Sequence, residues 1–116
     1  MPLVLVGYSR AVPDVSLERV IEVLSRQVAE QLDCPEDRVK SQDVVVWPIP
    51  LGKLGVQYSD LGILILTGSY PSRKKRLAEA KEQIGRAIHC ATPNLGSFVW
   101  IHPVDEAEYG FFPAVR

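Results

Sequence analysis

The sequence has few of the features by which a function is most readily recognised. Its 116 residues include two cysteines, Cys34 and Cys90, too few to predict a disulfide scaffold. The formal net charge is -1, so no excess of either sign points to nucleic acid or an anionic membrane as a partner. No apolar run is long enough to cross a bilayer, and the N-terminus lacks the basic and long apolar parts of a secretion signal. We therefore expect a cytoplasmic protein that binds neither nucleic acid nor membranes.

Motifs for cofactors and metals are also missing. The chain contains no GxGxxG pattern and no phosphate-binding loop, which argues against a nucleotide cofactor. The two cysteines with His89 and His102 lack the short paired spacing of a structural zinc site. His102 and Asp105 are not accompanied by the nucleophile elbow of a serine hydrolase. The sequence thus predicts no cofactor and no metal.

What is present is the composition and periodicity of one globular domain spanning residues 1–116. The chain is 47% hydrophobic and 23% charged, which is typical of soluble globular proteins. Apolar runs over 2–8, 42–49, 61–67 and 97–102 predict four strands, of which 61–67 has the composition of a strand buried on both faces. Apolar residues at helical spacing predict one helix from Asp14 to Leu32 and another from about 71 to 89.

The order strand, helix, strand therefore occurs twice. Each helix is followed within a few residues by a cysteine and a proline, which indicates an internal duplication of layout. Two architectures fit this order. One is a ferredoxin-like sheet, and the other is an α+β (α/β) fold of paired β-α-β units, with a four-stranded sheet and two helices on one face. About ten residues with two glycines separate the second and third strands, which favours the paired units over the tight hairpin of a ferredoxin-like domain.

Pro2 is the candidate catalytic residue. Removal of Met1 would make its secondary amine the N-terminus, and an α-amino group has an ordinary pKa of about 7.7–8.0. Burial and cationic neighbours lower such a pKa and leave a neutral base at physiological pH. A base of this kind can move a proton between carbon and oxygen of an enol or keto acid. Many proteins also begin with Met-Pro without using the proline in catalysis, but here Pro2 leads directly into an apolar strand.

Together these features resemble the tautomerase superfamily, which includes 4-oxalocrotonate tautomerase and macrophage migration inhibitory factor. Residues 32–39 (LDCPEDRV) are similar to the family's helix-to-strand turn, and residues 104–110 (VDEAEYG) to its closing segment. The resemblance covers nearly the whole chain. It implies a homotrimer with sites at subunit interfaces, an N-terminal proline base, and arginines that bind a substrate carboxylate. Tyr109 stands where several branches have tryptophan, which leaves the substrate open.

A run of four cations, residues 73–76 (RKKR), opens the second predicted helix. Cations at a helix N-terminus oppose the macrodipole, so the run is explained if an anion or an acidic neighbouring subunit lies there. The alternative is a solvated helix face, relieved by Glu79 and Glu82 nearby. The resemblance makes Arg73 the first candidate ligand of a substrate carboxylate, followed by Arg76.

Further candidates for substrate binding lie at both ends of the chain. Arg10 follows the first strand and can grip a carboxylate near Pro2, or it is an ordinary solvated turn residue. Arg38 is expected to pair with local carboxylates. The aromatic candidates for the wall of an apolar pocket are Tyr109, Phe111, Phe112, Trp47 and Trp100, the two tryptophans being equally well explained as core or interface residues.

The sequence thus predicts a keto–enol tautomerase of small carboxylic acids with Pro2 as general base. Two other hypotheses stay open. One is a non-catalytic trimer of the same fold that binds or regulates, and the other is a ferredoxin-like module that binds a small ligand or a subunit.

Overall fold

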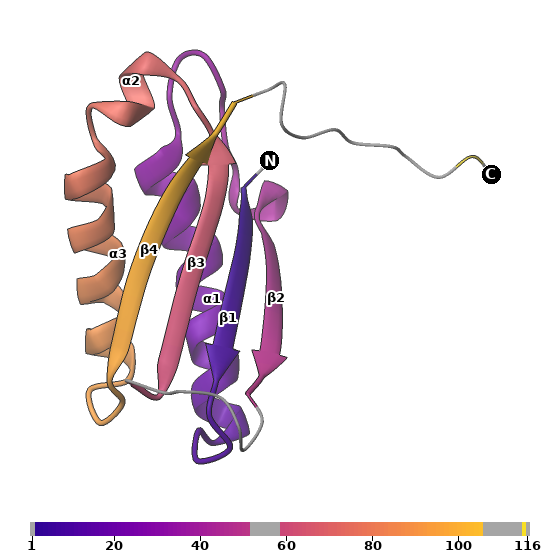
Figure 1. The fold of residues 1–116 in the computed structure, drawn as a ribbon, viewed down its shortest axis with the longest axis vertical. Helices are drawn as coiled ribbons and strands as arrows, with labels where there is room; N and C mark the ends of the chain where they lie inside the picture. Colours follow the sequence, from indigo (N-terminus) through magenta and orange to yellow (C-terminus); the bar gives the residue numbers. More distant parts are fainter. Residues whose placement is uncertain (1, 52–58, 106–114, 116) are drawn as a thin grey trace.

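The computed structural model describes residues 2–51, 59–105 and 115 (Figure 1). The elements along the chain are β1 (Leu3–Tyr8), α1 (Asp14–Leu32), the 3₁₀ turn η1 (Ser41–Asp43), β2 (Val45–Pro50), β3 (Leu61–Gly68), α2 (Pro71–Lys74), α3 (Leu77–Ala91) and β4 (Ser97–Val104). Within the described ranges, no helix combines the length and the apolar character needed to cross a membrane.

The four strands form one mixed sheet in the order β2-β1-β3-β4, and both long helices cover the same face of it (Figure 1). β1 and β2 are parallel, β3 and β4 are parallel, and the two pairs meet along the antiparallel β1 and β3. Each β-α-β unit therefore has its two strands side by side, whereas a ferredoxin-like fold splits them. The predicted duplicated β-α-β fold is confirmed, and the ferredoxin-like alternative is excluded.

The hydrophobic core lies between the sheet and the helices. Side chains alternate along each strand, so Val4 and Val6 of β1 and Ile63 and Ile65 of β3 point toward the helices and are fully buried. They pack against residues at helical spacing on α1 and α3, namely Val20, Leu24, Val28, Ile84 and Ile88.

The opposite face of the sheet has no helix over it in the described chain (Figure 1). Twelve of the residues on that face form three full rows across β2, β1, β3 and β4: Val45, Leu3, Leu66 and His102; Trp47, Leu5, Leu64 and Trp100; Ile49, Gly7, Gly62 and Phe98. We call these twelve positions the open face. Trp47 is 56% exposed and Trp100 is 65% exposed. The prediction that 61–67 is buried on both faces is therefore wrong for the single chain, because its residues on the open face are only partly buried.

The two edges of the sheet differ in their free backbone groups. The N–H of Val45 at the start of β2 and that of Leu51 just after it both donate to β1, so alternation turns positions 46, 48 and 50 away from the sheet. Two of these are Pro48 and Pro50, which have no N–H to offer. On β4, the same alternation turns outward the complete backbone groups of Ser97, Val99 and Ile101.

Two element boundaries differ from those predicted. The strand predicted over 42–49 begins only at Val45, because η1 occupies the residues before it. The helix predicted over about 71–89 is divided, since α2 ends at Lys74 and α3 begins at Leu77. Arg76 has φ -110° and ψ 4°, outside the helical range. α2 and α3 are therefore separate elements, and Arg73, which makes the contacts described below, belongs to α2.

Candidate functional site

Pro2 lies at the end of the sheet where β1 begins. Its side chain is fully buried, and its carbonyl oxygen accepts a hydrogen bond of 3.0 Å from the N–H of Val45. Extending the β1–β3 register by one residue beyond the pair Leu3 and Leu66 places Pro2 beside Thr67, which is 3% exposed.

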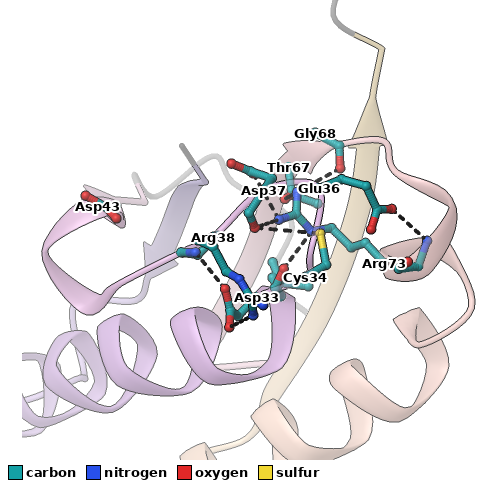
Figure 2. A network of polar contacts seen from close by, with 12 residues as sticks. Asp33, Cys34, Glu36, Asp37, Arg38, Asp43, Thr67, Gly68 and Arg73 are labelled. Carbon is teal, nitrogen blue, oxygen red and sulfur yellow. Dashed lines mark hydrogen bonds and ion pairs between the residues drawn. The ribbon is translucent and has the colours of Figure 1, made fainter.

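Arg73 lies on the helix side of the same end of the sheet and is 2% exposed (Figure 2). Its Nε donates to the Leu32 carbonyl at 2.7 Å, and its Nη1 donates to Thr67 Oγ1 and to the Gly68 carbonyl, both at 3.0 Å. Its Nη2 donates to the Asp37 carbonyl at 3.2 Å and to Asp37 Oδ2 at 3.0 Å. These five contacts match the five N–H donors of a guanidinium group.

Arg73 therefore joins the end of α1, the turn after it, the end of β3 and α2. Its buried charge is balanced by Asp37, with which it forms an ion pair. A substrate carboxylate would have to displace one of the five bonds in order to bind here. We assign Arg73 a structural role, and its predicted role as first carboxylate ligand finds no support in this geometry. The remaining cations of the run, Lys74, Lys75 and Arg76, are exposed.

The turn from Asp33 to Val39 supplies the carboxylates of this network (Figure 2). Asp33 Oδ1 accepts the N–H of Val39 at 2.9 Å and Oδ2 accepts Arg38 Nη1 at 3.1 Å, which confirms that Arg38 pairs locally. The bond from the Val39 backbone, followed by the contact with Arg38, lowers the pKa of Asp33. Glu36 Oε2 accepts the N–H of Ser72 in α2 at 3.2 Å, and hydrogen bonding by the Ser72 side chain and backbone lowers the pKa of Glu36.

Thr67 and Asp37 belong to this site although sequence analysis singled out neither. Thr67 carries the one polar side chain of β3. It is the last residue of the helix-facing row of this otherwise apolar strand. Asp37 lies within the turn motif at residues 32–39, and the structure shows that its carboxylate reaches α2. A lone polar residue ending a buried strand is the signal that could have pointed to Thr67.

The two remaining arginine candidates lie at opposite ends of the sheet. Arg10 is exposed and follows the far end of β1 from Pro2 (Figure 1). β1 has six residues, and at about 3.3 Å per residue this separates the two by roughly 20 Å or more within one chain. Arg76 is exposed between α2 and α3, and α2 lies at the end of the molecule where β1 begins (Figure 1).

The two aromatic candidates that the structure describes, Trp47 and Trp100, do not lie beside Pro2. Trp47 and Trp100 lie in the middle row of the open face. Tyr109, Phe111 and Phe112 lie outside the described residues.

A groove of about 770 Å³ lies elsewhere, between α3 and the start of β4. Its lining includes the side chains of Lys81, Arg86, His89 and Leu95 and none of the predicted site residues that the structure describes. The groove is therefore separate from the Pro2 end of the sheet.

Comparison with protein-family models and with curated proteins gives no match. Solved structures do match. A macrophage migration inhibitory factor-like protein from Entamoeba histolytica superposes with a TM-score of 0.68 at 11% identity, covering 96% of this chain and 95% of that one. A fused 4-OT described as a symmetric trimer gives 0.67 at 12% identity, covering 97% and 94%. A malonate semialdehyde decarboxylase gives 0.61 at 16% identity, covering 97% and 91%.

The fold of this chain is therefore tautomerase-like, as in these solved structures. Identities of 11% to 16% establish the likeness of fold alone and transfer no residue roles. In this tautomerase fold, Pro2 directly precedes one of the two central strands and is buried at the end of the sheet that Arg73 and Thr67 also occupy.

Proposed function

We propose that this chain is a keto–enol tautomerase of small carboxylic acids, and that the amine of Pro2, freed by removal of Met1, is its general base. The observation that carries the proposal is the burial of Pro2 at the head of a central strand of a tautomerase fold. Thr67, which lies beside Pro2, accepts a hydrogen bond from the Arg73 guanidinium. The Thr67 side chain thus links the positive charge of Arg73 to the surroundings of the amine. Apolar burial and a nearby cation both favour the neutral amine.

In this proposal, the neutral amine takes a proton from the substrate and returns it at the other end of the keto–enol system. The substrate carboxylate then needs a cation with free donors. Arg76 is exposed between α3 and α2, which lies at the Pro2 end of the molecule (Figure 1), and is our first candidate in place of Arg73. Arg10 can serve the site only from a neighbouring copy, because in its own chain it lies beyond the far end of β1.

We propose further that the working unit is a homotrimer assembled through the open face. An exposed apolar surface of this kind marks an interaction site, because single soluble chains rarely expose one. Three solved structures of this fold are described as trimers, one symmetric and two asymmetric. An assembly is also the arrangement in which Arg10 of one copy and Pro2 of another can share a site.

The chemistry is tested by ketonisation of phenylenolpyruvate or 2-hydroxymuconate, with the intact mass measured on the same sample. The mass should show loss of Met1. Pro2→Ala should lower kcat/KM by about 10²-fold or more, the usual contribution of a general base. Arg76→Ala and Arg10→Ala should raise KM, whereas Arg26→Ala, which changes an exposed arginine on α1, should leave both constants unchanged. Equal activity of Pro2→Ala and the wild type would contradict the proposal.

A trimer that binds or regulates without catalysis is the second candidate. It is favoured by one observation, the use of all five donors of Arg73 within the fold. Retention of Met1 in the purified protein, together with equal kcat/KM of Pro2→Ala and the wild type, would favour this second candidate over the enzyme.

A further inference from the structure

The open face contains a single ionisable side chain. Eleven of its twelve positions hold apolar residues or glycine, and the twelfth is His102. His102 is exposed and completes the row formed with Leu66, Leu3 and Val45, the row nearest to Pro2. One histidine in an otherwise uncharged apolar surface gives that surface a charge that depends on pH.

We propose that His102 makes association through the open face sensitive to pH, so that protonation separates the copies. This inference rests on the homotrimer proposed above. Free imidazole gains its proton near pH 6.5, and a charged imidazolium is costly to bury in apolar surroundings without a partner. In a separated chain His102 is exposed, and its charged form is hydrated. Protonation therefore favours separate copies, and association is strongest above pH 7.

No other ionisable side chain shares the row of His102 on the open face. Its row presents Leu66, Leu3 and Val45, and no helix packs on this face (Figure 1). Asp105 is the nearest carboxylate along the chain, is exposed, and follows the last residue of β4. The carboxylates of the turn 33–39 bond to Arg73, Arg38 and α2 on the helix side of the sheet.

The chain carries its own reporter and its own control. Its two tryptophans, Trp47 and Trp100, both lie on the open face, so their emission reports whether that face is covered. Its two histidines lie on different surfaces, because His89 is exposed on α3 beside the groove. His102→Gln and His89→Gln are therefore a matched pair. Neither side chain is part of the core, so both variants should keep the fold.

The experiment is a dilution series of wild type, His102→Gln and His89→Gln between pH 8.0 and 5.5, followed by sedimentation and tryptophan emission. Below the pH at which free histidine titrates, each buried imidazole weakens association by about tenfold per pH unit. Three copies together should raise the overall dissociation constant of a trimer by up to about a thousandfold per unit. His89→Gln should behave as the wild type does, and His102→Gln should remain assembled at pH 5.5.

Two kinds of result would overturn the inference, and they are distinguishable. A wild-type dissociation constant that is the same at pH 8.0 and 5.5, or a pH dependence that persists in His102→Gln, removes the role of His102 and leaves the trimer intact. A chain that stays monomeric at pH 8.0, or assembles without any change in tryptophan emission, overturns the open-face assembly itself.

Discussion

Each face of the sheet has an exception to the usual placing of charged and apolar residues. On the helix side, Arg73 is 2% exposed, although arginine is among the residues least often buried. On the open face, Trp47 and Trp100 are more than half exposed, although no other side chains of the protein are as large. A buried charge and a large exposed apolar surface are both more informative than an exposed charge or a buried apolar side chain.

In this protein, whether a side chain is buried depends more on the bonding and packing partners around it than on its residue type. Arg73 is tolerated inside because each of its donors meets an acceptor in the same chain. The tryptophans are exposed because both long helices in the described part of the chain cover the other face (Figure 1). The helix side is therefore complete within one chain, while the open face is covered only in the assembly that we propose.

The largest effect is expected when the buried charge is removed. Arg73→Met takes away all five bonds and leaves Asp37 without its partner, so the free energy of unfolding should fall by about 3–5 kcal/mol. Lys74→Met is the control, because Lys74 is exposed one residue further on, and it should change stability by less than about 0.5 kcal/mol. Urea unfolding measures both. Similar losses in the two variants would mean that the network does not support the fold.

Adjacent residues on β3 provide the next test, because they belong to different faces. Ile65 is fully buried against the helices and Leu64 lies on the open face. Ile65→Ala should cost about 2–5 kcal/mol in the free energy of unfolding of the dissociated chain, as large-to-small changes in cores do. Leu64→Ala should cost the dissociated chain clearly less and should instead raise the dissociation constant. A reversed order of the two stability losses would contradict the assignment of faces.

The smallest expected effect concerns the carboxylate that caps α2. The pKa of Glu36 is lowered from its ordinary value of 4.5, so the stabilisation is present above that value and is lost as the pH falls below it. Glu36→Gln should be slightly less stable than the wild type at pH 7, and the difference should vanish in acid. The effect is small because the group is exposed to solvent. Glu30→Gln on α1 is the control, and unfolding at pH 7 and pH 3.5 is the measurement.

Much of the fold could be predicted from the sequence because its signals are local. Apolar alternation and helical spacing identified the four strands and α1 with errors of a few residues. The break before Leu77 was not predictable, because it depends on Arg73 bonding to Leu32 and Asp37, which lie 41 and 36 residues away in the sequence. A run of cations looks the same whether or not one of its members turns inward.

The candidate site was predicted less well for a similar reason. The separation of Arg10 from Pro2 follows from the length of β1 alone, so it was within reach of the sequence. The exposure of Leu64 and Leu66 was not, because an apolar strand has the same composition whether a helix or a second copy covers its outer face. Sequence patterns predict which residues avoid water. They do not say whether those residues are covered by the same chain or by a second copy.

The prolines of β2 limit how copies of this sheet can join. Sheets with two free edges can add copies without end, which is the route to fibrils. Pro48 and Pro50 remove two N–H donors from the outward side of β2, so β4 is left as the one edge with consecutive donors and acceptors. Pairing through backbone edges then joins β4 to β4, a two-fold contact that uses both open edges at once. Such pairing stops at two copies, because neither chain then has a second edge of this kind among its described residues.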